Sequence, residues 1–278
     1  MAEPEPQRSR ESRTPAVGAN WRRREGWTTG RLLAATRRAR PPLLLFVALV
    51  LAWHGAVVAF AVPEILVPTP VAVADALVAG GATLIGDAAV TGATAAAGLL
   101  AGCAVGAVLA FAMTYSRTAA RIALPYVVAL RIAPLIAVAP LVFLWFGRGI
   151  PARAALVATL ALFPMTVATL DGLRSTPERY LALARSVDAS RPAVFLRVRV
   201  PAAAPSVFAG LKLAATLSIV GAVVAEFVTL RAGIGYRVFV TAERLQTAET
   251  YAALVTLSAL GVAFYLVPVL LERAVWAE

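Results

Sequence analysis

Long apolar blocks separated by short polar segments limit the folds open to this sequence. Of its 278 residues, 60% are hydrophobic, whereas about 45–50% is typical of soluble domains. A membrane-crossing helix needs about 20 consecutive apolar residues. The blocks therefore predict an all-α integral membrane protein with a transmembrane domain over residues 41–278 and six transmembrane helices, at about 43–62, 88–113, 122–146, 154–170, 206–227 and 251–271.

Arginines are distributed unevenly between the two sides that six spans would create. Nineteen lie on the side of the N-terminus, in residues 1–40, in the loop after the second span, in loop 172–205 and at the C-terminus, and five lie on the other side. Cytoplasmic loops carry the excess of positive charge, so both termini and loop 172–205 are predicted to be cytoplasmic. Residues 1–40 are predicted to form a basic, largely disordered tail. The net charge of +11 thus reflects topology, and no nucleic-acid partner is expected.

The segment from Ser175 to Pro205 is too highly charged for lipid and is predicted to lie in water between the fourth and fifth spans. Thr176 as a cap and Pro177 at the first helical position predict a helix start. Glu178, Ala182 and Arg185 lie on one side of this helix, and its apolar face holds Tyr180, Leu183, Ala184 and Val187. Such a helix either fills a groove of a partner protein or lies at the lipid headgroups, and the pattern leaves both open.

An ionisable residue, Arg131, lies about ten residues, or about 15 Å, into the third predicted span. A charge at that depth points to a function and should face the protein interior; alternatively, the apolar stretch starts later and Arg131 extends to the headgroups. Pro134 and Pro140 each remove a backbone hydrogen bond, so we expect this span to be kinked or split. Glu226, near the outer end of the fifth span, is a further candidate for a pathway or gate, the alternative being a carboxylate that reaches water.

Residue patterns that would support an enzyme are missing from the sequence. It has no G-x-x-x-x-G-K-[ST] phosphate-binding loop. It has one histidine and one cysteine, and no pair of carboxylates or Ser/His/Asp arrangement stands out. We therefore predict no catalytic residue, no cofactor and no metal site.

Loop 172–205 and its flanks resemble the permease subunits of bacterial binding-protein-dependent ABC importers. That family's loop reads E-A-A, three residues, G, nine residues, I-x-L-P, and the corresponding residues here are Ala182, Leu183, Ala184, Asp188, Val198, Val200 and Pro201, so the Glu and the Gly are replaced. The runs APLIAVAPLVFLWFGRG, DGLRS and GLKLAATLSIVGAVVAEF are similar to the nitrate, sulfonate and taurine branch. Residues 183–190 are similar to its sub-branch for pyrimidine precursors of thiamine.

The resemblance implies a type I ABC importer permease fold in the bacterial inner membrane, with a second copy completing a homodimer. A cytoplasmic ABC ATPase dimer would dock on the helix from about Pro177 to Asp188. An extracytoplasmic solute-binding protein would deliver a small polar or anionic solute, such as a sulfonate, taurine, nitrate or a pyrimidine thiamine precursor. Arg131 and Glu226 lie in the L-R-x-x-P and V-V-x-E-F patterns of the resemblance.

The alternative is a stand-alone secondary transporter or channel. Such proteins often have inverted repeats, paired broken helices and intramembrane carboxylates. This sequence shows one broken span and no inverted repeat, which favours the importer subunit.

Overall fold

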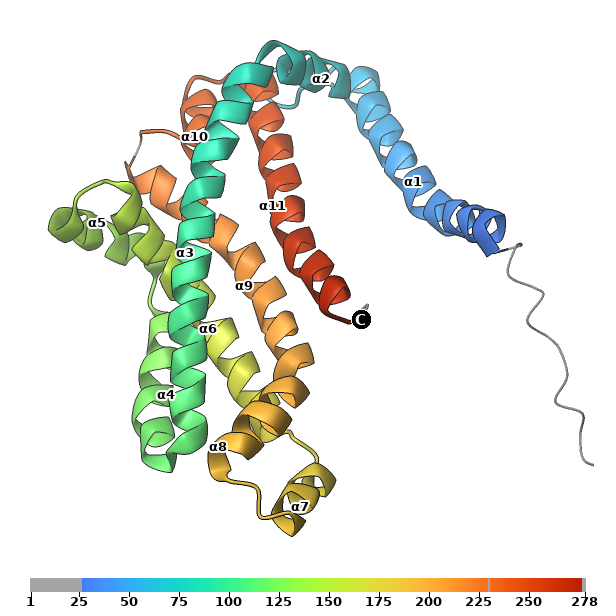
Figure 1. The fold of residues 1–278 in the computed structure, drawn as a ribbon. Coiled ribbons are helices and arrows are strands. Elements are labelled where there is room, and N and C mark those ends of the chain that lie inside the picture. Colours follow the sequence, from blue (N-terminus) through green and yellow to red (C-terminus); the bar gives the residue numbers. More distant parts are fainter. Residues whose placement is uncertain (1–26, 230, 277–278) are drawn as a thin grey trace, which may run out of the picture. The chain divides into compact units, whose positions relative to one another are not determined.

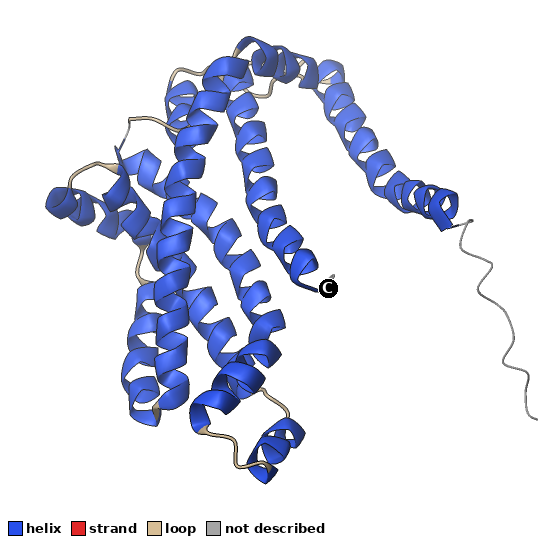
Figure 2. Cartoon of the chain, in the orientation of Figure 1, coloured by secondary structure: helices blue, strands red, loops and turns tan. Residues whose placement is uncertain are grey.

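The computed structural model describes residues 27–229 and 231–276, with side chains from residue 41 onward, and every regular element in these ranges is a helix (Figures 1 and 2). The chain divides into two units, residues 1–55 and residues 56–278.

Helix α1 (Trp27–Ala59) accounts for the described part of the first unit and extends into the second. Residues 27–40, part of the tail predicted to be largely disordered, are helical in the structure, and residues 1–26 lie outside the described residues. The run RLLAATRRAR consists almost entirely of strong helix formers, which explains the earlier start. The helix ends at Ala59, before the last three residues of the predicted span, and Ala61 has a φ of 47° in the turn that follows.

The second unit begins with a short helix whose start is fixed by its cap. Thr69 precedes α2 (Pro70–Ala79), and its Oγ1 accepts a hydrogen bond of 3.1 Å from the Ala72 N–H. The remaining elements follow in chain order: α3 (Gly81–Tyr115), α4 (Arg117–Ile132), α5 (Leu135–Phe146), α6 (Ile150–Arg174), α7 (Glu178–Ser186), α8 (Arg191–Val194), the π-helical turn η1 (Phe195–Arg199), α9 (Val200–Thr229), α10 (Ile234–Glu243) and α11 (Thr247–Trp276).

Five of the described stretches are long and apolar enough to cross a membrane, and α4 with α5 makes six when this bent pair counts as one span. The five are Pro41–Ala59, Gly81–Tyr115, Ile150–Arg174, Arg191–Thr229 and Thr247–Trp276. This agrees with the predicted all-α membrane fold.

The third span is split, as its prolines predicted, but at one proline only. Helices α4 and α5 meet at an angle of 102°. Ala133 has an extended ψ of 129°, because a residue before proline avoids the helical region. At Pro140, α5 continues without a break, although proline inside a helix removes a backbone hydrogen bond and crowds the carbonyl four residues earlier.

Helix α6 lies at the centre of the second unit, packed along α3 on one side and α9 on the other (Figure 1). Gly98, Gly102 and Gly106 recur every four residues on the α3 face that meets α6. A Cβ added to Gly102 would lie 2.6 Å from the Ala158 carbonyl oxygen, so the two backbones are in direct contact. Small residues at this spacing allow close packing of membrane helices.

Candidate functional site

Helix α7 projects from the helical unit between α6 and α9, where the sequence places the amphipathic helix (Figure 1). Its N-cap is Pro177, which makes no side-chain cap bond. The predicted cap at Thr176 is wrong, because its Oγ1 donates back to the Leu173 carbonyl of α6 at 3.4 Å.

The end of α7 is a Schellman turn built around Asp188. Asp188 has a φ of 48°. Its N–H donates to the Arg185 carbonyl at 3.1 Å, and the Ala189 N–H donates to the Ala184 carbonyl at 3.0 Å. The backbone at the glycine position of the loop motif is therefore left-handed, although Asp occupies it. Asp is one of the few residues besides Gly that adopt this conformation.

The apolar face of α7 borders an open groove. Leu183 is 65% exposed and Val187 70% exposed, whereas Ala184 is buried. The groove measures about 520 Å³ and is lined on the α7 side by Tyr180, Leu183, Ala184 and Val187, and on the other side by Ala193, Val194, Val198 and Ala202 among others. Exposed apolar residues around an unfilled groove are the features expected of a docking surface.

The polar side of α7 carries an ion pair between two of its own residues. Arg185 forms an ion pair with Glu178, and both side chains are largely exposed. Ala182 is exposed on this side, and Pro201 is exposed in the first turn of α9. An exposed ion pair of this kind contributes little stability, so Glu178 remains accessible to a partner.

Arg131 lies in the last turn of α4, directly before the break at Pro134. Its guanidinium stands over the Phe163 ring of α6, 5.4 Å from the ring centre, at cation–π distance. The residue is exposed at the surface of this single chain, so the chain itself does not bury it as predicted. A cation at a helix C-terminus is favourable, and here it marks the point where the span breaks.

Glu226 is fully buried, with 0% exposure, so the alternative of a carboxylate reaching water is wrong. The Thr91 hydroxyl of α3 donates to its Oε1 at 2.8 Å, and the Gly235 N–H in the first turn of α10 donates to its Oε2 at 2.8 Å. The Thr91 Oγ1 also accepts from the Ile234 N–H at 2.9 Å. Glu226, in α9, therefore places its carboxyl group at the positive, N-terminal end of the α10 dipole and links α10 to α3 and α9.

Arg153 is a candidate that the sequence analysis missed. It was counted as an outer-loop arginine, but the structure places it in the first turn of α6, only 8% exposed. Its Nε and Nη1 have no hydrogen-bond partner among the described residues. Unsatisfied buried donors are costly, so Arg153 joins the candidate residues.

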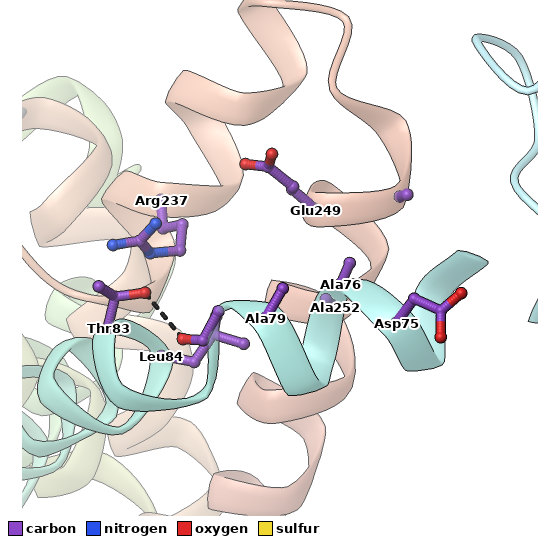
Figure 3. A pocket seen from close by; sticks show the side chains of 10 residues that line it. Asp75, Ala76, Ala79, Thr83, Leu84, Arg237, Glu249 and Ala252 are labelled. Carbon is purple, nitrogen blue, oxygen red and sulfur yellow. Dashed lines mark hydrogen bonds between the residues drawn. The ribbon is translucent and has the colours of Figure 1, made fainter. Parts of the chain in front are cut away.

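Where α2, α3, α10 and α11 meet, charged residues line a pocket of about 480 Å³ (Figure 3). Asp75, Thr83, Arg237 and Glu249 contribute its polar groups. Arg237 also forms an ion pair with Asp87 of α3. This end of the unit is opposite the end that carries α7 (Figure 1).

The structure thus groups the predicted site residues in three separate places. The coupling residues gather at α7 and its groove, and the residues Arg131, Pro134 and Pro140 lie in α4, α5 and the break between them. Glu226 lies near the end of α9, bonded to the first turn of α10. No hydrogen bond or ion pair joins Arg131 to Glu226 within the described part of the chain. The described residues also hold no cluster of metal-ligating side chains.

Residues 98–276 match the family described as "Binding-protein-dependent transport system inner membrane component". This range includes α4 to α11 and the second half of α3. It therefore contains the α7 loop, the broken span and Glu226.

Several characterised or named proteins are similar over long stretches. A probable ABC transporter permease protein of Haemophilus influenzae is 33% identical over 86% of this chain and 98% of its own length. The formylaminopyrimidine transport permease protein ThiX of Halalkalibacterium halodurans is 37% identical over 50% of this chain and 56% of its own length. A putative aliphatic sulfonates transport permease protein SsuC of Bacillus subtilis is 28% identical over 86% of this chain and 83% of its own length.

Proposed function

We propose a role in transport for each part of this chain, which belongs to the family of binding-protein-dependent transport system inner membrane components. The chain is a multi-pass membrane permease subunit of an ABC importer. The family implies an ATPase and a binding protein as partners. The comparisons lend no support to a stand-alone transporter or channel.

The observation that carries the proposal is the exposed apolar groove at α7. A separate cytoplasmic ATPase hydrolyses ATP and inserts into this groove, covering Leu183 and Val187. Glu178 supplies a carboxylate one helical turn before Ala182, which stands where the family motif has Glu. Movements of the ATPase then reach the membrane helices through α6 and α9, which flank α7.

A second copy of the chain completes the pathway. Arg131 is exposed in the single chain at a break in a span, and a charge in a span is retained where it faces protein or water. In a homodimer the two copies of Arg131 face the space between the subunits and act there on solute or gate. Glu226 acts as an anchor of α10 at the outer end of that space.

The solute is a small polar or anionic molecule. Relatives are named for formylaminopyrimidine and for aliphatic sulfonates, and a sulfonate, taurine, nitrate or a pyrimidine thiamine precursor is the class we propose here. The binding protein docks at the end of the chain that carries α2 and α10, where the charged pocket of Figure 3 lies. This end faces outward, and both termini and α7 face the cytoplasm of the inner membrane.

Reconstitution tests this assignment. The chain is placed in vesicles with the ATPase and the binding protein encoded beside it, and uptake of solute bound by that binding protein is measured. We expect uptake only when ATP, ATPase and binding protein are all present. Uptake by the chain alone, driven by an ion gradient, would instead identify a secondary transporter.

A further inference from the structure

A basic pocket lies on the other side of α8 from the α7 groove. It measures about 320 Å³ and is lined by Thr114 and Tyr115 at the end of α3 and by Arg185, Arg191, Phe195 and Arg199 among others. Val194 lines both this pocket and the α7 groove. The two hollows therefore differ in chemistry, one apolar and one with three arginines, although they share a wall.

The floor of the basic pocket is aromatic and fixed to α3. The Phe195 ring packs edge-on against Phe111, with 5.6 Å between ring centres, and is tilted against Tyr115, with 4.8 Å between ring centres. These contacts attach the π-helical turn η1 to the last turn of a membrane-spanning helix. The last turn of α3 is the end of a candidate membrane span, so the pocket lies beside that end, next to an aromatic cluster of the kind found at membrane interfaces.

Two of the three arginines are available for a ligand. Arg185 is engaged with Glu178. Within the described residues, neither Arg191 nor Arg199 has an ion pair. Guanidinium groups bind phosphate oxygens in paired hydrogen bonds. The pocket therefore offers two guanidinium groups, those of Arg191 and Arg199, above an aromatic floor.

We propose that this pocket binds the phosphate group of an anionic phospholipid and so holds the α7 loop against α3. Basic pockets at the cytoplasmic ends of membrane helices are suited to anionic headgroups. The arginines would hold the phosphate, while Phe195 and Tyr115 would contact the apolar part next to it. The proposal requires the unit to lie in a membrane, but it does not require ATPase docking at α7.

The test uses the full chain purified in detergent. Native mass spectrometry follows the binding of phosphatidylglycerol to the wild type and to the double variant Arg191→Gln/Arg199→Gln. Each arginine near an anionic headgroup contributes about fivefold in affinity, so we expect the double variant to bind on the order of 25-fold more weakly. Phosphatidylcholine, which has the phosphate without net negative charge, should bind more weakly than phosphatidylglycerol.

A matched control separates this pocket from general surface charge. Arg117→Gln/Arg121→Gln removes the same charge from the start of α4, and neither residue lines the pocket or the α7 groove, so its affinity should equal that of the wild type. Equal affinities for the wild type and the pocket variant, or equal losses in both double variants, would overturn the proposal. Displacement of the lipid by millimolar inorganic phosphate would support a phosphate site but overturn the assignment to lipid. Unchanged thermal melting confirms that the variants are folded.

Discussion

At Glu226 a single carboxyl group joins α9 to the next helix, α10, and to the distant helix α3. Its donors are Thr91 in α3, 135 residues away, and the Gly235 N–H at the start of α10. The V-V-x-E-F pattern indicates that this glutamate matters. Its partners were not predictable from the sequence, because they depend on how the helices pack.

Replacing Glu226 with Ala should destabilise the protein by about 1–3 kcal/mol, because the Thr91 hydroxyl and the Gly235 N–H lose a buried acceptor. The measurement is the thermal midpoint of the chain purified in detergent. Glu243→Ala, which removes an exposed carboxylate from the other end of α10, should leave the midpoint unchanged. Equal midpoints for the Glu226→Ala variant and the wild type would contradict the anchoring role.

Arg131→Ala should leave the complex assembled but impair solute uptake, because the proposed pathway loses its charge. Arg131→Lys should restore uptake only in part, since an ammonium cannot form the paired hydrogen bonds of a guanidinium or stack as well on Phe163. Uptake in reconstituted vesicles, normalised to the amount of assembled complex, is the readout. Wild-type uptake by Arg131→Ala would show that this arginine only extends to the headgroups.

At the level of the element, α7 shows what periodicity predicts and what it misses. Helical spacing placed the apolar residues on one face, and in the structure all four line the same groove. The left-handed backbone at Asp188 is not a matter of helical spacing. The capping pattern failed at Thr176, because a hydroxyl can bond either to the helix ahead or to the one behind, and here it bonds to Leu173. Short-range sequence signals do not resolve such competition.

Leu183→Asp should weaken ATPase docking by more than tenfold. Burial of a leucine contributes about 1.5–3 kcal/mol, where about 1.4 kcal/mol is a factor of ten, and the variant also places a charge in an apolar groove. Co-purification of the ATPase and stimulation of its activity are measured for the wild type, Leu183→Asp and Glu178→Ala. Ser186→Asp adds the same charge in the same turn away from the groove and should retain the ATPase. Full retention by Leu183→Asp would exclude α7 as the coupling element.

The packing of α3 on α6 depends on the absence of side chains at its glycines. Gly102→Ala should lower the thermal midpoint, since its Cβ would lie 2.6 Å from the Ala158 carbonyl oxygen and overpacking typically costs about 1–3 kcal/mol. Gly86→Ala in the same helix meets nothing within 4 Å and should be neutral or stabilising, because Ala favours helix. The opposite order of the two midpoints would show that α3 and α6 do not pack this closely.

For the whole molecule, the sequence was sufficient to predict the class of fold but not the exact arrangement. Hydropathy indicated the membrane helices, and the comparisons confirm the family. Sequence did not predict that Arg153 is buried at the start of α6, because loop and helix are hard to separate where a span begins near Gly149 and Pro151. Burial of this arginine depends on tertiary packing.

The arginine distribution predicts that α7 faces the cytoplasm and α2 the outside. Single cysteines are introduced at Ser186 in α7 and at Val78 in α2, which is 84% exposed, after Cys103 is replaced with Ala. An impermeant maleimide added to intact cells should label the Val78→Cys protein and spare the Ser186→Cys protein. Permeabilised cells should allow both to react. The reverse pattern in intact cells would refute the orientation.

The bend of 102° between α4 and α5 affects whether the number of membrane crossings before α7 is even or odd. If the pair enters the bilayer and leaves by the other face, an even number of crossings separates the N-terminus from α7, and both lie on one side. If the pair returns to the face where it entered, every segment after Phe146 changes side, and α7 with its arginines would lie outside. The bend at Ala133 and Pro134 therefore determines on which side of the membrane each later segment of the polypeptide lies. A substitution that turned the pair back to the face where it entered would invert the later helices rather than merely distort them.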